Sequence, residues 1–172
     1  METGFLWELQ SAGYKLRAEE IIDLRMHGVN AKFLEDLKQA GYDLPAGQIA
    51  ELSMRGVNSS FVRDLKFYSL HPPAAELVQL RMHGVTPEYL RGLHDAGLGE
   101  LSGDEVVELR QHGVPSEFAA AAKELGYHFT SRELIDLRTH GVDARYLKTL
   151  RDSGMQNLTE PQITQLRMHG VD

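Results

Sequence analysis

The sequence contains no cysteine and no long apolar run. Without cysteine the chain has no disulfides and no thiolate metal sites, although this absence does not identify a compartment. No apolar stretch approaches the roughly 18 residues of a membrane-spanning helix, so we expect no direct insertion into a membrane. The N-terminal METGFLWELQ also lacks the basic and apolar regions of a secretion signal. We therefore expect a soluble chain, either cytoplasmic or the soluble part of a membrane-anchored parent.

Positive charge is scarce and spread along the chain. Lys and Arg number 18 against 25 Asp and Glu, which gives a formal net charge of −7 at pH 7. Because the basic residues form no cluster, we expect no nucleic-acid partner. Catalytic signatures are also missing, since the sequence has no HExxH, GxSxG or P-loop pattern. We expect no enzyme activity and no cofactor.

What the sequence does contain is a repeat. The six residues LRMHGV occur three times, with near-copies between them. The glycines of these copies lie 28 or 29 residues apart, at Gly28, Gly56, Gly84, Gly113, Gly141 and Gly170. Six units account for the chain, approximately residues 1–29, 30–57, 58–85, 86–114, 115–142 and 143–172. Tandem periods between about 20 and 50 residues indicate a solenoid or a similar array.

Each unit carries two apolar patterns with helical spacing. Ile21 and Leu24 represent the first pattern, and Phe33, Leu34 and Leu37 represent the second. Spacings of three and four residues place each set on one helix face, whereas the alternation typical of a strand is absent. Helices of about ten residues are marginal alone in water, so neighbouring units must stabilise one another. The sequence predicts an all-α fold: a single α-solenoid domain over 1–172, with six two-helix repeats and about twelve short helices.

The copies of LRMHGV are interpreted as helix stops. Glycine supplies a left-handed residue after the helix, and the valine lies five residues after the leucine, as the hydrophobic contact of a Schellman motif requires. The histidine lies in the last turn, where a donor meets unpaired carbonyls. The predicted structural stop residues are His27, Gly28, Gly56, His83, Gly84, His112, Gly113, His140, Gly141, His169 and Gly170.

A metal-binding array is the alternative interpretation of the five stop histidines. Ligands of one ion lie ~2.0–2.1 Å from it, whereas equivalent positions on adjacent helical layers are ~8–10 Å apart. Arg55 stands at the sixth position, and a guanidinium is no metal ligand. The sequence therefore favours capping and predicts no metal site. Arginines two residues before the histidines, such as Arg25 and Arg81, are likewise interpreted as capping or ion-pairing groups, with clamping of an acidic partner as the alternative.

Two places where the repeat breaks supply the candidate partner-binding residues Trp7, Phe67 and Tyr68. Phe67 stands where other units have Ser, Gln, Asp or Glu, so an aromatic side chain is expected on a solvent-facing position. Tyr68 replaces a residue that is usually Ala, and LHPP (70–73) follows in place of a normal turn. Trp7 stands where other units have a charged residue or Ala. The alternatives are local repacking at a distorted joint for 67–73 and end-capping of the first layer for Trp7.

The consensus L-[ST]-x-x-[EQ]-[LIV]-x-x-LRxHGV-[TND]-x-x-[FY]-[LV] resembles the helical repeats that lie downstream of bacterial beta-lactam-sensor (BlaR/MecR-like) metallopeptidase domains. The copies LSGDEVVELRQHGV and HGVTPEYLRGLHDAGL carry the likeness, which extends over essentially the whole chain. The resemblance implies an accessory, regulatory or sensory repeat region of a larger membrane protein. It implies no catalytic residue here, because the peptidase's HExxH motif and membrane helices are absent from this sequence.

The leading functional prediction is a non-enzymatic scaffold that presents an extended surface to a protein or peptide partner, as the regulatory region of a larger membrane metallopeptidase. The first alternative is a self-assembling spacer, because opposite ends of the array present helices of different pattern and so permit end-to-end self-association. The second alternative is the metal-binding histidine array.

Overall fold

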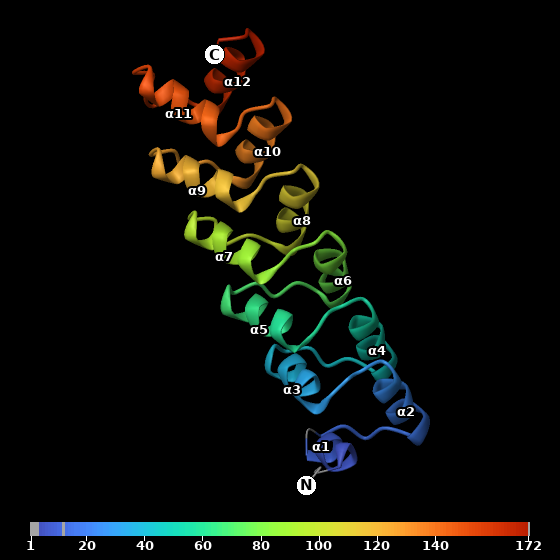
Figure 1. Ribbon diagram of the computed structural model, residues 1–172. Coiled ribbons are helices and arrows are strands. Elements are labelled where there is room, and N and C mark those ends of the chain that lie inside the picture. The colour runs from blue at the N-terminus through green and yellow to red at the C-terminus, as the bar shows by residue number, and fades with distance from the viewer. Residues whose placement is uncertain (1–3, 12, 172) are drawn as a thin grey trace.

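A computed structural model describes residues 4–11 and 13–171 of the chain (Figure 1). Within these ranges the regular structure is entirely helical, so the predicted all-α solenoid of twelve short helices is confirmed. None of these helices has the length and apolar character needed to cross a bilayer. The helices are α1 (Phe5–Ser11), α2 (Ala18–Met26), α3 (Ala31–Gln39), α4 (Ala46–Met54), α5 (Ser59–Phe67), α6 (Ala74–Met82), α7 (Pro87–Asp95), α8 (Gly103–Gln111), α9 (Ser116–Glu124), α10 (Ser131–Thr139), α11 (Ala144–Asp152) and α12 (Glu160–Met168).

The helices stack in two rows along an elongated array (Figure 1). Odd-numbered helices form one row and even-numbered helices form the other, so that α7 packs on α9 and α2 packs on α4. Each of the six sequence units contributes one odd helix followed by one even helix. Apolar side chains from both rows form one continuous core, and the two ends of the chain lie at opposite ends of the array (Figure 1).

The helix stops have the geometry of a Schellman motif. At the first copy of LRMHGV, the amide of Val29 donates to the carbonyl of Leu24 at 2.9 Å, and the amide of Gly28 donates to the carbonyl of Arg25 at 3.1 Å. Gly28 has a φ of 73°, and the Val29 side chain is buried in the core. The same two bonds recur after all of the remaining even helices, α4, α6, α8, α10 and α12. Each stop therefore ends an even helix and directly afterwards places an apolar side chain in the core.

Arginines of the even helices connect each stop to the next unit. Arg81 Nε donates to the carbonyl of Gly56 at 3.0 Å, and Arg110 Nη2 donates to the carbonyl of Gly84 at 2.9 Å. These glycines follow the C-caps of α4 and α6, so the guanidinium from the following unit satisfies a turn carbonyl just beyond each helix end. Capping in this structure thus crosses the boundary between repeats.

The turn after α5 makes the same stop without glycine. The amide of Leu70 donates to the carbonyl of Leu65 at 2.9 Å, as at the other stops, but Ser69 has a φ of 57°. A side chain in the left-handed region costs roughly 1–2 kcal/mol because Cβ crowds the backbone. This stop is therefore made at a conformational cost that the glycine-containing stops avoid.

We expect Ser69→Gly to increase the free energy of unfolding by about 0.5–1 kcal/mol, because glycine removes the Cβ penalty but adds entropy to the unfolded chain. Gly41→Ser is the reciprocal control, since Gly41 has a φ of 86° at the equivalent position after α3. It should lower the stability by a similar amount. Urea denaturation followed by helical circular dichroism measures both changes, and a loss of stability in Ser69→Gly would contradict this account of the turn.

Candidate binding groove

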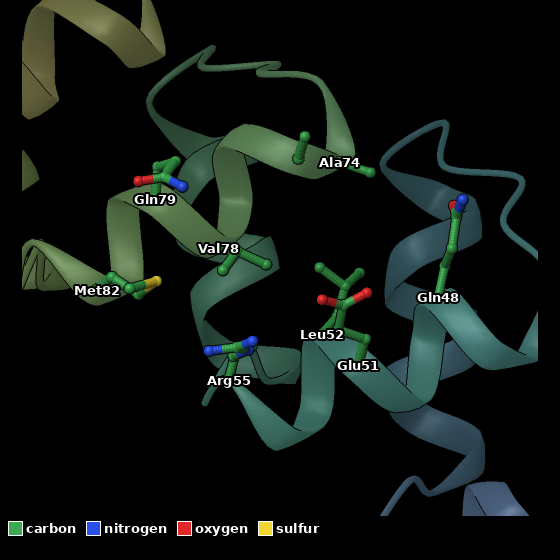
Figure 2. Close-up of a pocket in the computed structure, with 9 residues that line it drawn as sticks. Gln48, Glu51, Leu52, Arg55, Ala74, Val78, Gln79 and Met82 are labelled. Carbon is green, nitrogen blue, oxygen red and sulfur yellow. The ribbon is translucent and has the colours of Figure 1, made fainter.

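The even row is open at one layer. Successive even helices pack closely from α6 to α12, and α2 packs closely on α4, whereas α4 and α6 lack such packing. A groove with a volume of about 520 Å³ is lined by these two helices (Figure 2). Across this same layer the odd row stays closed, because α3 packs on α5. The array thus opens on one side only.

The two walls of the groove differ in chemistry. Ala74, Val78 and Met82 line it from α6, and their spacing of four residues places them on one helix face. Glu51 and Arg55 line it from α4, together with Gln48 and the largely buried Leu52. Figure 2 shows these side chains around the space between the two helices. The α6 wall therefore carries an apolar strip beside the exposed Gln79, and the opposite wall carries one acidic and one basic group.

Two of the three residues of the apolar strip on α6 have buried counterparts one unit earlier, whereas the counterpart of Met82, Met54, is also exposed. Ala46 and Ala50 of α4 are 3% and 2% exposed. Their counterparts 28 residues later, Ala74 and Val78, are only half-buried. Met82 is 61% exposed. A surface with the composition of an inter-helix contact is thus open to solvent at this layer.

The turn that leads into α6 is unusual and well fixed. Pro72 and Pro73 precede the helix, and a proline ring restricts its own φ to near −65°. The hydroxyl of Tyr42 donates to the carbonyl of Pro72 at 2.6 Å. Burial, with a smaller contribution from the Glu76 carboxylate, raises the pKa of Tyr42 to about 12, so this donor keeps its proton at neutral pH. The start of α6, and with it one wall of the groove, is held in place.

The three candidate residues chosen from the sequence lie in different environments. Phe67 is 77% exposed at the end of α5, and Trp7 is 63% exposed on α1. Tyr68 is only 9% exposed, and its ring packs against Phe67 and His94 with centroid separations of 5.0 and 5.4 Å. Its hydroxyl accepts a hydrogen bond from Arg91 Nε at 3.4 Å. Phe67 and Tyr68 are therefore adjacent, Trp7 lies two odd helices away, and repacking describes Tyr68 better than partner binding.

Sequence reasoning missed the residues that line the groove. Alanine and valine at helical spacing have the pattern of core residues, and nothing local marks Val78 as open to solvent. One signal was present, because the methionine of LRMHGV has no role in the stop. Met26, Met54 and Met82 form a column at this position with exposed fractions of 78%, 59% and 61%. The recurrent methionine therefore indicates an exposed position on the even helices, and Met82 is the one that lines the groove.

The stop histidines all occupy the residue that follows an even helix. In His27 and His140, the ring Nδ1 lies 2.8 Å from a carbonyl oxygen one turn earlier in the same helix. His83 Nε2 lies 3.2 Å from the side-chain nitrogen of Gln111 in the next unit. Within residues 4–11 and 13–171, no three side chains of the metal-ligating types come together. Among the described residues, the geometry thus provides no set of ligands for a metal-binding array.

We expect Phe67→Ser to change the free energy of unfolding by no more than about 0.5 kcal/mol, because the side chain that it removes is largely in solvent. Tyr68→Ser is the matched comparison one residue away. It should cost about 2–4 kcal/mol, since it truncates a buried aromatic side chain. Thermal and urea denaturation of both variants measure the difference, and similar losses in the two would show that Phe67 belongs to the core.

No protein-family model matches this chain, and no curated protein matches its sequence. The likeness to sensor-linked repeats therefore rests on the repeat motif alone. What the groove can do follows from its own geometry and chemistry.

Proposed function

We propose that the chain is a non-enzymatic scaffold whose groove between α4 and α6 binds a protein or peptide segment. The observation that carries the proposal is the open apolar strip on α6, which lies opposite the polar wall of α4. In the preceding layer α2 packs on α4, and Ala46 and Ala50 of the equivalent face are buried there. A partner segment would bury the same kind of surface here.

An amphipathic helix is the segment that fits these walls best. Ala74 to Met82 spans eight residue steps, or roughly 12 Å at the helical rise. Two turns of a partner helix cover that length with apolar residues at spacings of three and four. Its polar flank would then face Glu51, which accepts hydrogen bonds, and Arg55, which donates them.

The exposed methionines support recognition of a partner at this surface. Met54 and Met82 belong to the two helices that line the groove, and Met82 is part of its lining. Methionine is unbranched and polarisable, so it adapts its shape to a partner with little strain. A surface of this kind suits partner segments of varied sequence.

The motif resemblance supports a regulatory role for the proposed scaffold. Repeats of the LRxHGV type lie downstream of beta-lactam-sensor metallopeptidase domains, so we infer that this array is a regulatory or sensory region of a larger bacterial membrane metallopeptidase. In that setting the groove would hold a segment of the parent protein or of a protein that the parent controls.

The proposal is tested with peptides selected from a random library on the wild-type chain. We expect Met82→Glu to weaken the selected peptides at least tenfold, because a carboxylate would enter the apolar strip. Met168→Glu is the matched control, since Met168 has the same repeat position and is 67% exposed but does not line the groove. Fluorescence anisotropy gives both affinities. Equal binding to the two variants would place the peptide site elsewhere.

A second candidate function is end-to-end assembly, which a separate surface favours. Met155, Leu158 and Leu166 line a hollow of about 370 Å³ beside α12. Leu166 is half-buried, whereas its counterpart Leu137 is fully buried in the preceding unit. Leu6 and Trp7 of α1, in the first layer of the array, are 59% and 63% exposed. The first helix of one copy would continue the alternation of rows after the last helix of another.

Sedimentation velocity over a hundredfold range of concentration tests this second function. Assembly predicts a mass that grows with concentration, and Leu166→Glu should return the chain to a monomer because it places a carboxylate in the contact. A wild-type chain that remains monomeric at every concentration would eliminate assembly and leave the groove as the proposed functional surface.

A further inference from the structure

The arginine series of the even helices has one interruption. Arg25, Arg81, Arg110, Arg138 and Arg167 share one position, whereas α4 carries Ser53 there. The Ser53 hydroxyl also bonds to the preceding unit, but at a different atom, because it donates to the carbonyl of His27 at 2.7 Å. The boundary between the first and second units is therefore bridged by a short hydroxyl in place of a guanidinium.

The intact layers show how a guanidinium is held at this position. Arg81 donates from Nε to the carbonyl of Gly56 at 3.0 Å and from Nη1 to the carbonyl of Val85 at 3.3 Å. Its guanidinium carbon lies 5.0 Å from the centre of the Phe61 ring. Two carbonyl acceptors and one aromatic face thus form the binding site for the guanidinium.

The same arrangement holds a second arginine further along the array. Arg138 donates to the carbonyls of Gly113 and Val142 at 3.2 and 3.1 Å, and lies 5.7 Å from the ring centre of Phe118. Because two separate layers use equivalent atoms, the site is a property of the repeat.

The equivalent residues of the second unit surround an open hollow. Gly28, Phe33, Ser53 and Val57 help to line a space of about 270 Å³.

One basic side chain also lines the hollow, but it does not oppose a cation there. Arg63 lies 3.4 Å from the buried carboxylate of Asp36, which partly neutralises it. Arg91 and Lys148 stand at the repeat position of Arg63 in the units that follow those of Arg81 and Arg138. A basic residue at this position therefore also follows units that hold the bound arginine, and the net charge of −7 favours the approach of a cation.

We propose that this hollow is a binding site for the guanidinium group of an arginine, supplied by a peptide or by the free amino acid. The group would donate to the carbonyls of Gly28 and Val57 and lie against Phe33, as Arg81 does one layer on. A planar guanidinium can bridge two carbonyls and stack on a ring at once, whereas an ammonium is a point charge without that fork. The site is separate from the groove between α4 and α6 and does not depend on the proposed function.

The test uses the full chain labelled with ¹⁵N and titrated with Nα-acetylarginine amide. We expect saturable shifts of the Gly28, Ser53 and Val57 amides, with at least tenfold weaker binding of the uncharged isostere Nα-acetylcitrulline amide and of Nα-acetyllysine amide. Free arginine is titrated in parallel. Tighter binding of the blocked probe would assign the ligand to a peptide, and tighter binding of free arginine would assign it to the amino acid.

Two variants control the site itself. Ser53→Arg should supply an internal guanidinium, abolish the shifts and raise the urea midpoint, while Arg110→Ser should create a second set of shifts around Gly84. Circular dichroism verifies that each variant is folded, and the Ser53→Arg result stands even if Arg110→Ser unfolds. The proposal is overturned if arginine causes no saturable shifts in the wild type, if citrulline binds equally well, or if the shifts persist in Ser53→Arg.

Discussion

The stability of this chain depends on ending each helix at the right residue. Helices of nine residues are too short to be stable alone, so their apolar faces must meet those of neighbouring units in fixed register. The left-handed residue at Gly28 and its counterparts sets that register, because it reverses the chain and directs Val29 into the core. Core, rows and grooves all follow from this repeated turn.

A second level of order comes from bonds that cross the repeat boundaries. Arg81 and Arg110 satisfy carbonyls that belong to the preceding unit, so each unit completes the capping of the one before it. α4 departs from this scheme twice, with Ser53 in place of arginine and Arg55 in place of histidine. It also forms one wall of the groove. These two substitutions therefore lie on or next to the helix that lines both the groove and the hollow beside Ser53.

The sequence predicted local features well and contacts between units poorly. Glycine spacing and apolar periodicity gave the helices, their order and their stops, because each depends on residues close together in the chain. The exposure of Phe67 followed from comparison among units, whereas the burial of Tyr68 depends on packing against His94 of the next unit. Val78 looks like a core residue in the sequence, but it is half-buried and lines the groove between α4 and α6. The glycine carbonyls that accept from Arg81, Arg110 and Arg138 likewise lie about one repeat earlier in the chain.

The one-sided opening between α4 and α6 also bears on the mechanics of the array. In a repeat protein the energy that couples neighbouring units scales with the interface that they share. The layer between the second and third units retains α3 against α5 but has much weaker packing in the even row. We therefore expect bending of the array to cost least at this layer, about an axis along the odd row. A segment bound in the groove would add contacts there and so should make this layer harder to bend.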